Sequence, residues 1–323
     1  MHNIYDQLEY WSKKHPDKTA IYSFEQKLTY RALFQITKRI AFFCRSNNIQ
    51  PGEKVLICNT NEIESWLIAI GLAHEGVTAC MNGSLIPKLN NYPFDWYFTP
   101  EIIKGIPTEK VIKTDEKWFA NLPAFSNAKL IKQQDLNPSH INNLILTSGT
   151  TGSPKLVPWT IDNIYKRAVN NINLFNDPRP ICLISLHAGV MLLHCFGGII
   201  SGSPIAMLSS SPNKLLEYLN QSENQSIYTS PAVLNILLNT LESNQIDPPK
   251  IDTIYSAGSY ISPITCQKLS GFFNCKVINY YGSTEAGGIG MSFYVPENPA
   301  IFSKLNLFPG VNIEIVDEND VPL

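Results

Sequence analysis

Seven small or hydroxylated residues follow an apolar run in the middle of the chain, and a proline and a lysine come next; residues 143–158 read NLILTSGTTGSPKLVP. Glycines let a backbone turn tightly, and hydroxyls with a mobile lysine suit polyphosphate oxygens. The spacing differs from the common P-loop, GxxxxGK followed by Ser or Thr. Residue types alone leave a phosphate-binding loop and an ordinary loop equally open. The candidates are Thr147, Ser148, Gly149, Thr150, Thr151, Gly152 and Lys155.

A second segment, NYYGSTEAGG, combines aromatic, small and acidic residues at 279–288. Tyr280 and Tyr281 offer faces on which a base could stack, and Thr284 is a neutral donor. Glu285 is a lone acid among glycines, which suits a Mg²⁺ ion held by few protein ligands plus phosphates. The alternative is a plain strand with buried tyrosines and a solvated glutamate.

Strands and helices alternate around these segments, which predicts an α/β fold with largely parallel sheets. A helix is expected after Thr29, and another is expected to begin at Asn61, capped by that residue with Glu64 reaching back. Two more helices are expected at 211–219 and 231–241. Strands are expected at 54–58, 77–81, 143–148, 180–186, 204–208, 252–258 and 276–282, with a half-exposed strand over VNIEIVD, 311–317.

Three of the expected strands, those of 143–148, 252–258 and 276–282, lead into unusual loops. Ligands of open α/β sheets bind beyond the carboxyl ends of the strands. If the three strands are neighbours, their loops converge on one crevice.

Residues 181–208 carry no charged side chain and are long enough to span a bilayer. Glycines, a proline and two histidines interrupt them, so a buried strand–helix–strand is expected instead of a membrane span. His194 is expected in the core. A formal charge of -2 gives no reason to expect nucleic acid as a partner. The N-terminus lacks signal-peptide features, and seven scattered cysteines without CxxC spacing indicate reduced, buried thiols in a cytoplasmic protein.

The order TSGTTGSPK, LISLH, YSAG and NYYGSTE resembles the adenylate-forming superfamily of acyl- and aryl-CoA ligases, nonribosomal adenylation domains and luciferases. LTYRALF (28–34) and GLAHEGVTACMNGSLIP (71–87) are similar to its weaker signatures. The resemblance covers nearly the whole chain. It implies the αβαβα-type large N-terminal domain of these ligases, with layered sheets flanked by helices. The implied subdomains are 1–140, an ATP-loop subdomain at 141–300, and the start of a β subdomain at 301–323.

The resemblance also implies a two-step reaction. A carboxylate attacks the α-phosphate of ATP to give an acyl-adenylate, and the thiol of CoA or of a carrier-protein phosphopantetheine then takes the acyl group. A small carboxylic acid and a carrier protein are the implied partners. ATP and Mg²⁺ are the implied cofactors, as cations and donors stabilise the charge on the pentacovalent phosphorus.

Residue roles follow from the same resemblance. Thr147 to Lys155 would hold the outer phosphates, and Gly258 and Ser259 would flank the adenine. Asn279 would lie near the adenine amine, and Tyr281 would stack on the base. Thr284 would touch the α-phosphate, and Glu285 would hold Mg²⁺. The nucleotide-binding segment also includes Tyr280 and Gly282.

His187 ends the segment LISLH, where CoA ligases of the family carry a histidine motif lining the acyl pocket. Amino-acid-activating members place an Asp-containing motif there, whose carboxylate pairs with the substrate ammonium. No acid lies between Arg179 and Glu217, and an unpaired buried ammonium costs several kcal/mol. We therefore expect a substrate without an α-amino group. Small residues predict room in the acyl site, which His187 would share with Gly189, Gly258, Gly282, Ala286, Gly287 and Gly288.

The family pattern continues with a ribose-binding Gly-Asp box and a mobile C-terminal lid domain that supplies a lysine, and neither occurs before Leu323. The first expectation is therefore a truncated N-terminal core of a longer ligase. The alternative is a naturally short nucleotide- or acyl-binding module that needs a separate C-terminal partner. On either reading the isolated chain is expected to adenylate weakly or not at all.

Overall fold

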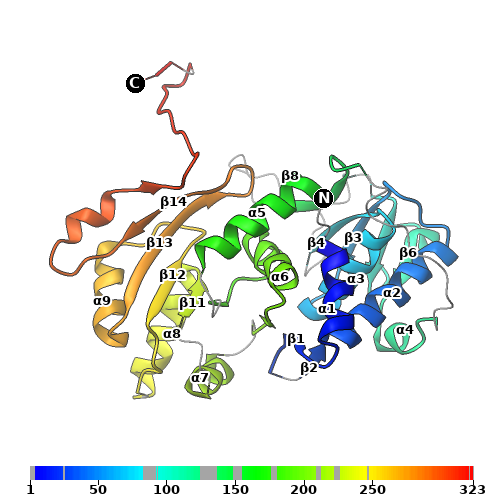
Figure 1. The fold of residues 1–323 in the computed structure, drawn as a ribbon, viewed down its shortest axis with the longest axis horizontal. Coiled ribbons are helices and arrows are strands. Elements are labelled where there is room, and N and C mark those ends of the chain that lie inside the picture. Colours follow the sequence, from blue (N-terminus) through cyan, green and yellow to red (C-terminus); the bar gives the residue numbers. More distant parts are fainter. Residues whose placement is uncertain are drawn as a thin grey trace. The chain divides into compact units, whose positions relative to one another are not determined.

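The computed structural model describes residues 4–24, 26–82, 92, 94–123, 137–147, 155–175, 180–208, 212–221, 226–245, 247–319 and 321–322. The chain divides into two compact units, Met1–Ser209 and Ser210–Leu323. This division by packing differs from the subdomain boundaries expected at 140 and 300, which stay predictions. Together the units contain an α/β fold of three mixed sheets flanked by helices (Figure 1).

The first unit is built on a six-stranded sheet of order β6-β5-β3-β4-β7-β8. Its strands pair in parallel except for the antiparallel edge pair β7–β8. The strands are β3 (Lys54–Cys58), β4 (Thr78–Asn82), β5 (Trp96–Thr99), β6 (Val111–Lys113), β7 (Ile141–Thr147) and β8 (Lys155–Thr160). A small sheet of order β10-β1-β2 contains β1 (Thr19–Tyr22), β2 (Lys27–Thr29) and β10 (Ile205–Ala206). The short strand β9 is Ile181–Cys182.

Helices pack around these sheets. They are α1 (Ile4–Lys14), α2 (Tyr30–Ser46), α3 (Glu62–His74), η2 (Thr108–Lys110), α4 (Glu116–Ala120), α5 (Ile161–Leu174) and α6 (Gly189–Ser201). The helix expected after Thr29 is confirmed. Thr29 caps α2 by accepting from the Ala32 N–H, and the helix buries Leu33 and Ile40.

At the start of α3 the capping differs in one detail from the expectation. Asn61 caps the helix as expected, because its side chain accepts from the N–H groups of Ile63 and Glu64. Glu64 does not reach back to the Asn61 backbone. Asn59 Oδ1 takes that N–H at 2.9 Å, and Glu64 accepts from Asn59 Nδ2 at 2.7 Å instead. Asn59 therefore fills the role expected of Glu64.

The apolar run at 181–208 forms a strand, a helix and a strand, β9, α6 and β10, as expected. His194 is buried in α6, as expected of a core residue. Among the described residues, no helix is long and apolar enough to cross a membrane. All seven cysteines are buried, and burial raises the pKa of Cys58 and of Cys80 to about 12. These thiols are therefore protonated and poorly nucleophilic at neutral pH.

In the described part of the second unit, five strands follow the order β15-β14-β13-β12-β11. β11, β12 and β13 are parallel, and β13–β14 and β14–β15 are antiparallel. The strands are β11 (Ser226–Thr229), β12 (Thr253–Ser256), β13 (Lys276–Ser283), β14 (Gly287–Phe293) and β15 (Asn306–Leu307). The helices are α7 (Pro212–Gln221), α8 (Pro231–Ser243), α9 (Pro263–Phe273) and η4 (Pro299–Ser303).

The condition that the three loop-bearing strands are neighbours holds only in part. β12 and β13 are neighbours in one sheet, whereas β7 belongs to a different sheet, that of the first unit. The strand expected over 311–317 is wrong. Among the described residues this segment makes only an isolated bridge between Val316 and Pro322, and an alternating sequence forms no strand without a partner backbone.

Candidate functional site

The candidate residues are divided between the two units. Thr147, Lys155, His187 and Gly189 belong to the first, and the residues from Gly258 to Gly288 belong to the second. Each group is therefore described within its own unit.

Thr147 and Lys155 are the paired end residues of the β7–β8 hairpin. The Thr147 hydroxyl donates to the Lys155 carbonyl at 3.5 Å. The expected phosphate-binding residues between them, Ser148, Gly149, Thr150, Thr151 and Gly152, lie outside the described residues. A strand follows the loop, whereas a helix follows the glycine-rich loop of P-loop proteins, which agrees with the spacing argument against a P-loop.

His187 lies just before the start of α6 and joins a compact polar cluster. Its Nδ1 is 2.7 Å from Ser185 Oγ, and Ser185 Oγ donates to Glu62 Oε1 at 2.8 Å. The Leu186 N–H donates to the same Glu62 oxygen at 2.9 Å. Glu62 is the first residue of α3, so the beginnings of two helices hold the cluster together.

Burial lowers the pKa of His187 below its ordinary value, and the Glu62 charge opposes that shift. His187 Nε2 is buried and has no hydrogen-bond partner among the described residues. The imidazole is therefore anchored at one nitrogen and unsatisfied at the other.

The sequence reasoning missed Ser185 and Glu62. Ser185 is two residues before His187, and this short spacing is the signal in the sequence that points to their contact. Glu62 is 123 residues from Ser185, and no pattern in the sequence links the two. The sequence has no acidic residue between 179 and 217. The fold nevertheless brings the Glu62 carboxylate of α3 to this segment.

Glycines expected to leave room in the acyl site are mostly packed. A Cβ at Gly189 would lie 2.6 Å from Trp159, and one at Gly288 would overlap Tyr280 Oη. A Cβ at Gly282 would overlap the Gly287 carbonyl oxygen. Nothing lies within 4 Å of the Cβ position of Gly258, but its φ of +87° disfavours other residues. Of these four glycines, Gly258 alone has open space at its Cβ position among the described residues, and the assignment of the glycines to the acyl site stays a prediction.

Alternation along β13 sorts the expected base-binding residues onto two faces. Asn279 and Tyr281 line one pocket of about 260 Å³. Tyr280 packs with the rings of Tyr228 and Phe308, at centroid distances of 5.8 and 5.6 Å. Tyr280 therefore belongs to the aromatic packing of the opposite face, and the pocket offers one β13 tyrosine.

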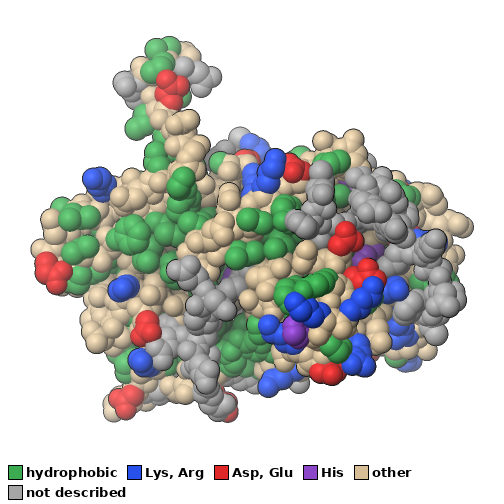
Figure 2. Space-filling model, in the orientation of Figure 1, with side chains coloured by type: hydrophobic (Ala, Val, Ile, Leu, Met, Phe, Trp, Pro, Cys, Tyr) green, Lys and Arg blue, Asp and Glu red, His purple; other side chains and the backbone are tan. Residues whose placement is uncertain are grey.

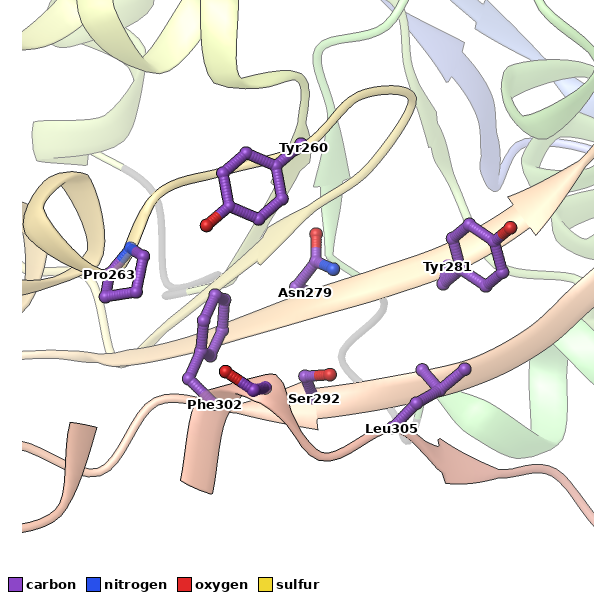
Figure 3. A pocket seen from close by; sticks show the side chains of 8 residues that line it. Tyr260, Pro263, Asn279, Tyr281, Ser292, Phe302 and Leu305 are labelled. Carbon is purple, nitrogen blue, oxygen red and sulfur yellow. The ribbon is translucent and has the colours of Figure 1, made fainter. Parts of the chain in front are cut away.

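The pocket has aromatic walls and an unsatisfied polar atom (Figure 3). Tyr260, from the loop after β12, and Phe302, from η4, flank Asn279, and Tyr281 stands further along β13. Asn279 Oδ1 is buried without a hydrogen-bond partner among the described residues. Tyr281 is 53% and Tyr260 77% exposed, and Figure 2 shows hydrophobic side chains gathered over β13 and β14. Exposed rings beside a buried acceptor without a hydrogen-bond partner among the described residues suit a planar ligand that carries a donor.

The turn between β13 and β14 contains Thr284, Glu285 and Ala286. Ser283 Oγ accepts from the Ala286 N–H at 3.0 Å and stabilises this turn. Glu285 is exposed. Among the described residues, no group of three or more His, Cys, Asp or Glu side chains could hold a metal. A single carboxylate still fits Mg²⁺, which commonly keeps waters and takes its other ligands from phosphates.

The sequence is similar to one enzyme family and to several individual proteins. Residues 100–323 match the family model described as AMP-binding enzyme. Bacitracin synthase 3 from Bacillus licheniformis is 26% identical over 335 residues, which are 95% of this chain and 5% of that protein. D-alanine--D-alanyl carrier protein ligase from Lactococcus lactis is 24% identical over 344 residues, which are 95% of this chain and 65% of that protein. The chain thus spans less than two thirds of either relative.

Solved structures share the fold. The N-terminal domain of FACL13 from Mycobacterium tuberculosis aligns with a TM-score of 0.75 and 18% identity, over 93% of this chain and 80% of that one. The long-chain-fatty-acid-CoA ligase FadD1 from Archaeoglobus fulgidus aligns with a TM-score of 0.80 and 16% identity, over 100% and 73%. The α/β fold described above is therefore that of the N-terminal domains of adenylate-forming enzymes.

Proposed function

Because this chain belongs to the AMP-binding enzyme family, we propose that it serves the ATP-dependent activation of a carboxylic acid. A carboxylate oxygen bonds to the α-phosphorus of ATP, the bond from that phosphorus to the bridging oxygen breaks, and pyrophosphate leaves. A thiol of CoA or of a carrier protein then bonds to the acyl carbon and loses its proton, and AMP leaves. The observation that carries the proposal is the pocket of Asn279 and Tyr281.

Adenine fits the chemistry of that pocket. Its exocyclic amine is a donor that would satisfy the buried Asn279 Oδ1. Its planar ring would lie against the half-exposed Tyr281, and aromatic stacking contributes about 1–3 kcal/mol per base. Gly258 and Ser259, at the end of β12, would lie beside the base, and the open space at Gly258 allows a close approach.

The phosphates need donors and positive charge. Thr147, Lys155 and the loop between them would hold the outer phosphates, and Thr284 would touch the α-phosphate. Glu285 would hold Mg²⁺, which neutralises charge on the phosphate oxygens when bound.

We propose further that the acid carries no α-amino group. Residues 180–216 contain no acidic side chain that could pair with an ammonium. Glu62 is the carboxylate that the fold brings to this segment, and its Oε1 already accepts from Ser185 and from the Leu186 N–H. A substrate ammonium would compete with both of these bonds.

A binding panel tests this function. Acyl-sulfamoyl-adenosine mimics of matched acids, with and without an α-amino group, are titrated into the chain by calorimetry. We expect saturable binding with a preference for mimics lacking the amine. Lys155→Ala and Glu285→Ala should each weaken ATP·Mg²⁺ binding by about tenfold or more, because each removes a charged contact worth about 1.5–3 kcal/mol. Preference for an α-amino mimic would overturn the substrate class, and the absence of binding by any mimic would overturn the function.

A further inference from the structure

The number of protons available in the His187 cluster determines which nitrogen of the His187 ring carries a hydrogen. Ser185 Oγ has one proton and lies within hydrogen-bond distance of three partners. The His187 backbone N–H donates to it at 3.4 Å, and Glu62 Oε1 and His187 Nδ1 lie 2.8 and 2.7 Å from it. An ionised carboxylate can only accept, so the serine proton must point to Glu62. The remaining contact is a hydrogen bond only if His187 Nδ1 carries a proton and donates it to Ser185 Oγ.

Assigning the Ser185 proton to the bond with His187 would leave the contact between Ser185 and Glu62 without a hydrogen. If Ser185 gave its proton to Nδ1, two acceptor oxygens would face each other at 2.8 Å. The Leu186 N–H already aims at Glu62 Oε1, which favours negative charge on that oxygen. The hydrogen-bond pattern therefore selects the Nδ1–H form of the imidazole.

This arrangement is not that of a hydrolytic triad. In such a triad the acid bonds the histidine, and the histidine accepts the serine proton. Here the acid bonds the serine, and the serine accepts from the histidine. Ser185 is thus an anchor for the ring and is not activated as a nucleophile.

We propose that Ser185 and Glu62 are positioning residues that hold His187 in the Nδ1–H form, so that Nε2 accepts a hydrogen bond from a hydroxyl on the carboxylic acid substrate. The choice of a substrate hydroxyl rests on the proposed function, whereas the form of the ring rests on the hydrogen bonds alone. Nε2 is buried without a partner among the described residues, so a ligand donor would satisfy it. Burial also lowers the pKa of His187, which keeps Nε2 free of a proton at neutral pH.

Nitrogen NMR of the full chain tests the form of the ring. The chain is labelled with ¹⁵N in its histidine rings, and the His187 signals are assigned by their loss in His187→Gln. At about pH 7.5, where an ordinary histidine is mostly neutral, we expect the Nδ1–H form. Ser185→Ala should shift the ring to the Nε2–H form or to a mixture, and Ser185→Thr, which keeps the hydroxyl, should preserve it. An Nε2–H form in the unmodified chain, or an unchanged Nδ1–H form in Ser185→Ala, would overturn the proposal.

The ligand is tested with acyl-sulfamoyl-adenosines that differ only in one hydroxyl, placed at successive positions of the acyl group. We expect one hydroxylated isomer to bind about tenfold tighter than its parent, which corresponds to about 1.4 kcal/mol. That gain should be lost in Ser185→Ala and kept in Ser185→Thr. Equal binding of every isomer and its parent would overturn the hydroxyl assignment. Failure of all mimics to bind would refute the proposed function and the hydroxyl assignment together, and the spectra would still decide the form of the ring.

Discussion

Asn279 lies two residues before Tyr281 on β13, and the two side chains line the same pocket. The spacing puts an amide and an aromatic ring on one face of a strand, where a planar base can meet both. Tyr280, between them, faces the other way and packs with Tyr228 and Phe308. One face of the strand thus lines the pocket, and the other packs against aromatic rings.

The two tyrosines should respond differently to truncation. Tyr280→Ala removes contacts with two aromatic rings and leaves a cavity, so we expect the free energy of unfolding to fall by about 2–3 kcal/mol. Tyr281→Ala removes a half-exposed ring, and a loss of about 0.5 kcal/mol is expected. Urea denaturation of both variants measures the difference. Equal losses would contradict the division of roles along β13.

Asn279 should contribute to the choice of base. Its Oδ1 would accept from the amine of adenine, whereas hypoxanthine presents a carbonyl oxygen at that position. We expect the chain to bind ATP more tightly than ITP, and Asn279→Ala to reduce that preference by about 3- to 10-fold, which is the range of one hydrogen bond. Calorimetric titration with both nucleotides measures this effect. The prediction fails if Asn279→Ala retains the full preference.

The ion pair of Arg45 and Glu75 should stabilise the first unit. The Arg45 guanidinium bonds both Glu75 oxygens, at 2.8 and 3.1 Å, and the Glu75 side chain is only 4% exposed. Arg45→Ala would leave a buried carboxylate without its partner, and we expect a loss of about 2–3 kcal/mol, reduced from the fully buried case because Arg45 is partly exposed. Lys166→Ala breaks the exposed pair with Asp162 and serves as control, with a loss below about 1 kcal/mol. Similar losses in the two variants would argue against this role.

His74 should make the fold sensitive to acid. Burial lowers its pKa to about 4, and its ring packs against Tyr5 and Phe34. Below about pH 6.5 the unfolded chain binds a proton that the folded chain refuses, so stability falls as pH drops from about 6.5 to about 4. His74→Leu should remove about 2–3 kcal/mol of this decline between pH 7.5 and 4.5, as followed by denaturation at each pH. The exposed His15 provides a control in His15→Leu. An unchanged decline in His74→Leu would show that another group is responsible.

Local patterns predicted much of the fold because they record which faces are buried. The helix α2, the strand β13 and the strand–helix–strand at 181–208 all follow from apolar spacing. Contacts between distant segments could not be predicted this way. Glu62 meets Ser185 only because α3 and the loop before α6 come together in the folded unit, and Asn59 replaced Glu64 at the start of α3 through a local competition between side chains.

The presence of glycines does not by itself predict open space in the folded chain. A small residue predicts free space only if nothing else enters it. At Gly189 the space is filled by Trp159, and at Gly288 by Tyr280. The strand expected at 311–317 is wrong because alternation describes a single segment, whereas a strand also requires a second segment to pair with, and among the described residues this one makes only an isolated bridge.

Titration of the chain with ATP in the presence of Mg²⁺, followed by calorimetry, tests the central claim most directly. We predict saturable binding in the unmodified chain and a loss of about tenfold or more in Tyr281→Ala, because the ring contributes about 1–3 kcal/mol of stacking. Tyr10→Ala, which removes another exposed tyrosine, should bind ATP like the unmodified chain. The absence of saturable binding, or equal affinities in Tyr281→Ala and the unmodified chain, would contradict the assignment of this pocket to the adenine of ATP.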